Sequence, residues 1–200
     1  MRAPVLLSLA VLAACGPPGG TSYATFAILT EGTGDPVVTR VPHGPGHRWQ
    51  YELVAENAFY SRASFVWNEG TVQLPSGATA DRRITNLDVA YIQGGDDGEF
   101  LWGSDREPLL DRPIVMLSLP LRLGKTWTTG DDDIPDWYRF EVETVETLDT
   151  PAGRLVTARV QQLNSRTGEV VARWYADGIG LVQRVGRDDS SGGITRTRLL

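Results

Sequence analysis

Residues 138–144 read YRFEVET and carry the clearest structural signal in the chain. Tyr138, Phe140 and Val142 alternate with charged residues, so one face of this segment is apolar and the other is charged. Alternation with a period of two is typical of a β-strand that buries one face. The segment therefore predicts a half-buried strand rather than a helix.

The same alternation continues on both sides of this segment, with turn-forming residues in between. Residues 150–153 and the run Gly94–Gly98 are rich in Gly, Pro and Asp, which is typical of tight connections between antiparallel strands. The best helical candidate, Ala55–Ser61, is short enough to be a turn. Further strands are predicted at residues 24–30, 48–55, 63–67, 70–74, 79–85, 87–93, 99–103, 155–163, 170–175, 181–185 and 194–199.

Residues 113–119 form the longest apolar run outside the N-terminal segment. A run of this length is typical of a buried central strand, and a lid over an apolar cavity is the alternative. So many strands must curl or stack to bury one face. We therefore predict an all-β fold, an antiparallel meander that forms a curved sheet, an open barrel or a β-clam with little helix. A single domain at residues 23–200 accounts for it.

The N-terminus has the parts of an export signal that is removed. A positive charge at Arg2 precedes a short apolar stretch, and small residues lead up to Cys15. The apolar stretch is too short to span a bilayer, which needs about 20 residues. Residues 12–15 read Leu-Ala-Ala-Cys and resemble the bacterial lipobox, which implies cleavage before Cys15 and a diacylglyceryl group on its thiol. An ordinary cleaved signal that ends near a cysteine is the alternative.

Residues 1–14 are thus predicted to be a cleaved lipoprotein signal peptide, and residues 15–22 a lipidated cysteine with a flexible tether rich in Gly and Pro. Two or more acyl chains hold a protein stably on a membrane. By resemblance to lipoprotein sorting in Gram-negative bacteria, Gly16 favours the outer membrane. We expect a lipid-anchored protein of the bacterial cell envelope that faces the periplasm or the surface.

Composition argues against several partners and sites. The formal net charge of −6, without a basic cluster, argues against nucleic acid as a partner. Cys15 is the only cysteine, so its lipidation leaves no thiol for a disulfide or a metal. Lys125 is the only lysine, and the arginines are scattered along the chain. Scattered arginines favour the base composition of a GC-rich genome over an anion-binding site as their explanation.

His43 and His47 are the only histidines, and the Pro and Gly residues around them exclude a helix. A loop could still bring both to one metal ion, but no cysteine or nearby carboxylate cluster completes a tetrahedral set. We interpret them as solvated loop histidines. The sequence predicts no metal site and no cofactor.

The densest acidic patch, Asp131–Asp133 with Asp136, offers oxygen ligands for calcium but lacks the spacing of a known calcium loop. A solvated loop is the simpler interpretation. Glu141 and Glu143 share one face of their strand, and we expect them to face water rather than to form a glycosidase pair. The chain contains no Gly-x-Ser-x-Gly elbow and no glycine-rich loop followed by a helix. We predict no catalytic residue.

Three motifs resemble a group of uncharacterised exported bacterial lipoproteins, over roughly residues 117–187. They are Gly-Lys-Thr-Trp at residues 124–127, Thr-Pro-Ala-Gly-Arg-Leu at 150–155 and Trp-Tyr-Ala-Asp-Gly-Ile-Gly-Leu-Val at 174–182. Relatives tend to have Pro and Val in place of Asp177 and Ile179. The resemblance implies a β-rich, clam-like periplasmic domain without a settled activity. Its positions are turn glycines and core tryptophans, which is a folding signature rather than a catalytic one.

These observations favour a membrane-anchored lipoprotein with a non-enzymatic role, either as a binding domain for an envelope protein or lipid or as a support of the envelope. One alternative is a carrier of lipid or acyl chains in an open β-barrel, which requires residues 113–119 and several tryptophans to line an empty cavity. A second alternative is a metal-dependent hydrolase that uses the acidic patch at residues 131–136.

Overall fold

The computed structural model describes residues 26–55, 61–85, 88–106, 109–110, 112–129, 138–187 and 193–200. The predicted signal peptide, Cys15 and the tether lie outside these ranges. The acidic patch at residues 131–136 and most of the helical candidate Ala55–Ser61 also lie outside them.

The described residues form β-strands and no helix, which confirms the all-β prediction. All pairings between neighbouring strands are antiparallel. A membrane-spanning helix is accordingly absent from this part of the chain. The strands are β1 (Phe26–Val38), β2 (Arg48–Ala55), β3 (Ser61–Gln73), β4 (Thr79–Thr85), β5 (Val89–Gly95), β6 (Gly98–Ser104), β7 (Ile114–Ser118), β8 (Leu121–Thr129), β9 (Tyr138–Thr150), β10 (Gly153–Asn164), β11 (Val170–Ala176), β12 (Gly180–Arg187) and β13 (Ile194–Leu199).

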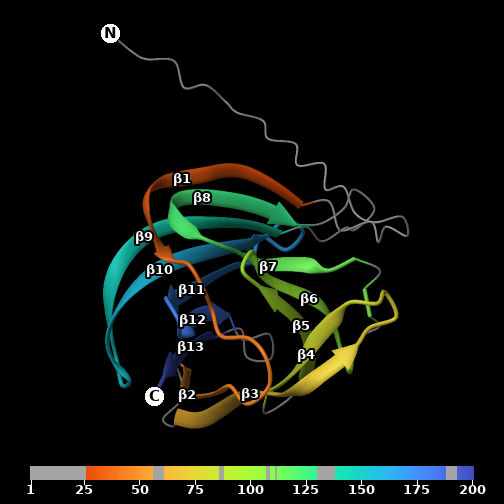
Figure 1. The fold of residues 1–200 in the computed structure, drawn as a ribbon. Coiled ribbons are helices and arrows are strands. Elements are labelled where there is room, and N and C mark those ends of the chain that lie inside the picture. The colour runs from red at the N-terminus through yellow and green to blue at the C-terminus, as the bar shows by residue number, and fades with distance from the viewer. Residues whose placement is uncertain are drawn as a thin grey trace.

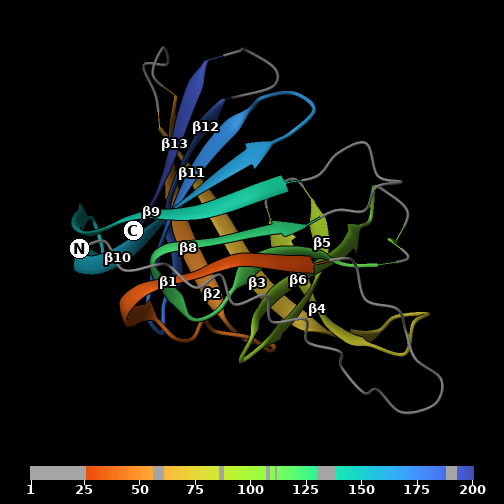
Figure 2. The same ribbon diagram turned by 90° about the horizontal axis from the view of Figure 1, so that it is seen from above.

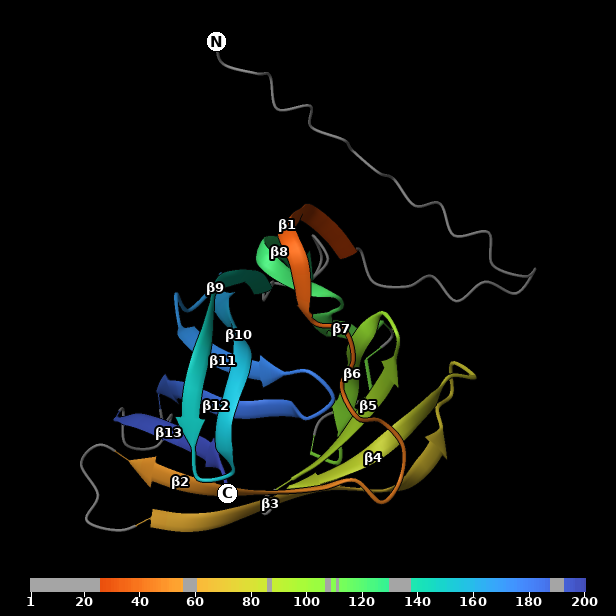
Figure 3. The same ribbon diagram turned by 60° about the vertical axis from the view of Figure 1, so that its left-hand side comes forward.

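The strands form one curved sheet that does not close on itself (Figures 1 and 2). Its order is β1-β8-β9-β10-β11-β12-β13-β2-β3-β4-β5-β6-β7, so β1 and β7 are its edges. Two meanders, β2–β7 and β8–β13, join where β13 pairs with β2. The sheet bends so that β9–β12 lie opposite β4–β7 (Figure 3). This architecture matches the predicted curved sheet or β-clam.

The alternation at residues 138–144 places the side chains as the sequence predicts. Phe140 and Val142 are fully buried in the main hydrophobic core. Trp127 stacks on Phe140 with ring centroids 5.0 Å apart and planes 7° from parallel. Since aromatic side chains bury the largest apolar areas, this stacked pair anchors the concave face of β8 and β9.

Residues 113–119 contain β7, which is buried but is the last strand of the sheet rather than a central one. Val115 and Leu117 pack into the same core as Trp127, at 3% and 0% exposure. The backbone N–H of Val115 donates to Oγ1 of Thr129, 3.0 Å away. An edge strand can therefore be apolar here, because its side chains face the core of the opposite meander. The segment fills a core and does not form a lid.

Two further strands differ from the sequence prediction. β3 is one strand rather than two, because a register shift between Asn68 and Gly70 makes a bulge instead of a turn. β8 was not among the predicted strands. Lys125, Thr126 and Trp127 are buried one after another, which breaks the polar–apolar alternation of a half-buried strand.

Lys125, the only lysine, is buried at 1% exposure. Its ammonium donates to the carbonyl oxygens of Leu119 and Pro120, each 3.2 Å away. Burial lowers the pKa of this ammonium, and the carboxylate of Glu31, 4.0 Å away, acts in the opposite direction. The lysine thus stabilises the connection between β7 and β8 by binding one buried and one partly buried carbonyl group.

Residues 39–47, which we call the strap, run from β1 to β2 and contact both meanders. Val41 is buried in the main core. The N–H of Gly44 donates to Oδ2 of Asp81 on β4 over 2.7 Å. His43 lies against Gly94 of β5 so closely that a Cβ on Gly94 would be 1.8 Å from Nδ1 of His43. The strap therefore packs where the open sheet would otherwise expose its interior.

We predict that Gly94→Ala lowers the free energy of unfolding by about 1–3 kcal/mol, because the new methyl group occupies the space of the His43 ring. Urea denaturation followed by tryptophan fluorescence measures this. Gly70→Ala is the matched control, since a Cβ at Gly70 meets open space. In a His43→Ala background the Gly94→Ala substitution should cost much less. An equal cost in both backgrounds would contradict the contact.

Candidate functional site

The two histidines lie in different environments. His47 is exposed, as predicted, and its ring stacks on Trp49 with centroids 6.0 Å apart. His43 is not a solvated residue, because the strap packs it against Gly94, and both of its ring nitrogens are buried without a hydrogen-bond partner among the described residues. Within the described ranges no group of three or more His, Cys, Asp and Glu side chains could hold a metal ion.

The concave face carries two arginines side by side. Arg173 on β11 and Arg184 on β12 are direct cross-strand partners, so their side chains project from the same face. Tyr175 lies two residues beyond Arg173 on β11 and is part of the main core. A guanidinium N–H of Arg173 donates to Oε1 of Gln162. Both arginines retain partial solvent exposure.

A second charged group lies on the opposite meander. Arg83 on β4 forms an ion pair with Glu99 on β6, with 2.7 Å between Nη2 and Oε1. Nε of Arg83 also donates to Oδ1 of Asn68 over 3.2 Å, and Nδ2 of Asn68 donates to Asp81 over 3.2 Å. The charge of Arg83 is therefore balanced by carboxylates on its own side of the fold.

Tyr175 connects the two charged groups electrostatically. Its side chain is only 5% exposed, and burial raises the pKa of its hydroxyl to about 12. The charges that act on this hydroxyl are those of Arg173, Glu99, Arg83 and Arg184, which come from both meanders. No described residue forms a hydrogen bond with the Tyr175 hydroxyl, whereas that of Tyr51 donates to the carbonyl of Leu181 over 2.8 Å.

The charges of Arg173 and Arg184 are not neutralised by an ion pair within the described residues. Burial lowers the pKa of Arg173, the charge of Arg184 acts in the same direction, and Glu169 is the only carboxylate among the causes that oppose them. Like charges directly opposite each other destabilise a pair of strands. The concave face thus holds an uncompensated positive charge beside an unpartnered hydroxyl.

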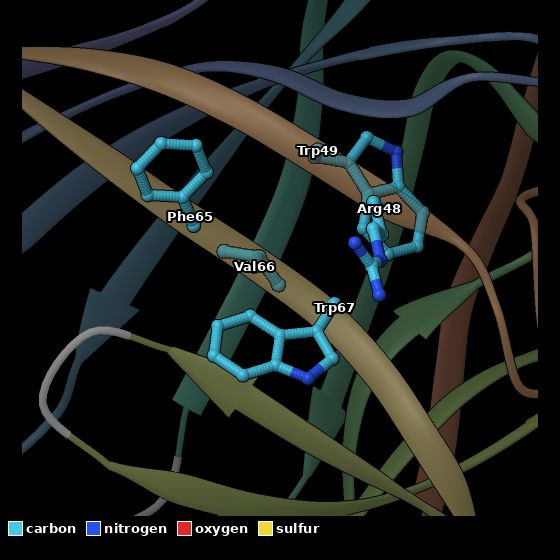
Figure 4. Close-up of a pocket in the computed structure, with 5 residues that line it drawn as sticks. All are labelled: Arg48, Trp49, Phe65, Val66 and Trp67. Carbon is cyan, nitrogen blue, oxygen red and sulfur yellow. The ribbon is translucent and has the colours of Figure 1, made fainter.

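A shallow hollow of about 280 Å³ lies on β2 and β3. Figure 4 shows the rings of Phe65 and Trp67 and the guanidinium of Arg48 around it. Arg48 pairs with Trp67 in the register of the two strands, and both belong to the face opposite Trp49. Trp49 and Val66, which also line the hollow, belong to the other face, and the Trp49 ring lies 5.7 Å from the guanidinium carbon of Arg83, so the hollow is not confined to the outer face.

The remaining sequence candidates are structural. Glu143 lies on the outer face, where it accepts a hydrogen bond from Gln161 (2.6 Å) and approaches Nε of Arg159 (3.4 Å). It is thus paired on the surface rather than fully solvated.

In the motif at residues 174–182, Nε1 of Trp174 donates to Glu146 over 2.7 Å, and Gly178 adopts a positive φ of 68°. These are turn and core positions, as the resemblance implies.

Sequence spacing did not single out Arg173 and Arg184, because arginines occur throughout the chain. The available signal was the alternation Val171, Arg173, Tyr175, in which a charge occupies a position of the inward face. Only the register of the sheet shows that β12 lies beside β11 and that the partner of Arg173 is another arginine.

No family model and no curated protein matches this chain. Two solved structures are similar in part. One is a candidate lipoprotein from Parabacteroides distasonis, at 14% identity and a TM-score of 0.41, covering 83% of this chain and 98% of the other. The second is a candidate exported protein with a YmcC-like fold from Bacteroides fragilis, at 10% identity and a TM-score of 0.37, covering 82% and 98%. Similarity at this level does not establish a function.

Asp177 ties the strap to the β11–β12 turn. Its Oδ1 accepts hydrogen bonds from the N–H and the hydroxyl of Thr39 (2.7 and 2.9 Å) and from the N–H of Arg40 (3.1 Å). The backbone bond from Thr39 is the main reason why the pKa of Asp177 is lowered from its ordinary 3.8. A carboxyl with a lowered pKa stabilises the fold above its unfolded pKa, and this contribution is lost as the pH falls through the folded pKa.

We predict that Asp177→Asn lowers the free energy of unfolding at pH 7 by on the order of 1 kcal/mol, a modest value because the site is exposed. The difference from the native chain should shrink as the pH falls below 3.8, since Asp177 then becomes protonated in the unfolded chain and next in the folded one. Urea denaturation across this pH range measures it. A difference that does not change with pH would show that the charge of Asp177 is unimportant.

Proposed function

We propose that this chain is a lipid-anchored binding protein of the bacterial cell envelope, attached through Cys15 to the outer membrane, and that it holds its ligand on the concave face without transforming it. The lipobox-like residues 12–15 support the anchor. The observation that supports binding is the unneutralised pair Arg173 and Arg184 on a partly accessible inner face.

Two neighbouring arginines without carboxylate partners are energetically unfavourable inside a fold. Charged groups within a fold are ordinarily paired, because desolvation of an unpaired charge is unfavourable. Arg173 and Arg184 face each other instead, whereas Arg83 and Arg198 have carboxylates at 2.7 Å. A perturbed cluster of this kind that is also reachable by solvent is typical of a functional site.

The alternative of an acyl-chain carrier has less support. It needs an empty apolar interior, whereas Val115, Leu117 and Trp127 pack together as a core. The alternative of a metal-dependent hydrolase depends on the acidic patch at residues 131–136, which lies outside the described residues. No observation on the described residues favours either alternative over binding.

The anchor is tested by metabolic labelling. A bacterial host that processes lipoproteins should incorporate radiolabelled palmitate into the full chain and retain it in the membrane fraction. Cys15→Ser should abolish the label, because no other residue of this chain offers a thiol. Absence of label on the native chain, or equal label on the variant, would refute the anchor.

The binding role is tested on the native lipidated chain, purified in a mild non-ionic detergent. We expect its melting temperature to rise when a protein-free extract of the host envelope is added, since a ligand that binds only the folded state stabilises it. Boiled bovine albumin in the same detergent, treated with the same extract, controls for effects on the dye signal. No rise at any extract concentration would count against a binding protein.

A further inference from the structure

The inference concerns the chemistry of the ligand and rests on the proposed binding function. We propose that Arg173, Arg184 and the hydroxyl of Tyr175 form a site for a phosphate monoester group. The three side chains come from neighbouring positions of β11 and β12, two of them from the cross-strand pair Arg173–Arg184 and the third two residues along β11.

The charge of the two arginines is the first feature that favours a phosphate ligand. Arg173 and Arg184 supply two positive charges, and neither has a carboxylate of the described residues within 4.0 Å. A phosphate monoester carries about −1.5 to −2 charges at neutral pH, which matches two guanidinium groups. A single carboxylate would leave about one positive charge unmatched.

The second feature is the set of hydrogen-bond donors that the site offers to phosphate oxygens. Guanidinium groups present several N–H donors in a planar fork that suits phosphate oxygens. Arg173 uses one of its donors on Gln162, so others remain. The hydroxyl of Tyr175 is protonated at neutral pH, since its ordinary pKa of 10.0 is raised further by burial, and in the proposed site it donates to a third oxygen. Thr197 pairs with Arg184 on the neighbouring strand and brings a further hydroxyl to the same face.

The third feature is the position of the carboxylates around the two arginines. The carboxylates whose charges act on Arg173 or Tyr175 are Glu169, next to β11, and Glu99 on the opposite meander, while Asp81 acts on Arg83. Glu99 is engaged by Arg83 at 2.7 Å, and Asp81 accepts hydrogen bonds from Gly44 in the strap (2.7 Å) and from Asn68 (3.2 Å). Their negative charges are therefore directed toward Arg83 and the strap, and an anion can approach the arginines of β11 and β12.

The experiment measures the melting temperature of the detergent-solubilised native chain with inorganic phosphate and, separately, with dihexanoyl phosphatidic acid, at an ionic strength held constant with sodium chloride. Both probes should raise the melting temperature. A much stronger effect of phosphatidic acid assigns the phosphate to a lipid headgroup, and equal effects assign it to a soluble ligand. Dihexanoyl phosphatidylcholine, which has no monoester, and the dicarboxylate glutarate should have little effect.

Three variants test the residues. Arg173→Met and Arg184→Met should each weaken phosphate binding by at least about tenfold, as loss of a charge-assisted contact does. Tyr175→Phe should weaken it by a smaller factor. Arg196→Met is the matched control, because Arg196 is exposed on β13 and its direct partner on β12 is Val185, which places it on the opposite face from Arg184.

The arginine variants also separate binding from folding. Arg184→Met removes one of two like charges and should leave the melting temperature without ligand unchanged or raise it, while the phosphate-induced rise disappears. Arg173→Met also loses its hydrogen bond to Gln162, so the control for folding is Arg184→Met. An equal loss of phosphate binding in Arg196→Met, or an equal rise in melting temperature with glutarate, would overturn the phosphate site. If the envelope extract stabilises the native chain but neither phosphate probe does, the binding function stands and this assignment is wrong. If no ligand stabilises it, both are wrong.

Discussion

The structure depends on one constraint, which is that the first and last strands of its sheet do not pair with each other. A closed barrel would satisfy the backbone of both edges and seal the interior. Here β1 and β7 are the edges of the sheet, so apart from the pairing of β13 with β2, side-chain contacts must hold the two meanders together. The stacked Trp127 and Phe140 with the side chains of β7 form one such contact, and the strap forms a second. Hydrogen bonds from Trp49 to the carbonyl of Ile179 (2.9 Å) and from Tyr51 to that of Leu181 (2.8 Å) add others.

The open sheet divides its inner face into two chemical regions. Toward β7, β8 and β9 the face is a packed apolar core. Toward β11, β12 and β4 it carries arginines, tyrosines and carboxylates, of which Arg83 and Glu99 are paired while Arg173 and Arg184 are not. Because folded domains are only marginally stable, the packed core has to offset the unfavourable free energy of the uncompensated charge in the polar region.

Much of the fold follows from local patterns, and the exceptions have physical causes. Alternation at Phe140 and Val142 predicted their burial, and Gly94–Gly98 predicted the hairpin turn between β5 and β6. The pattern failed for β8, where consecutive buried residues include a lysine bound to carbonyl groups. It also failed for His43, since only the path of the strap brings that ring against Gly94.

The sequence by itself determined the all-β class, the meander, the inward and outward faces of residues 138–144 and the expected lipid anchor, because each of these is encoded in neighbouring residues. Only the tertiary structure decided that β7 is an edge, that the sheet stays open and that Arg173 lies beside Arg184. The reason is that strand order and register join residues far apart in the chain. A periodic pattern within one segment does not show which two arginines will become cross-strand partners.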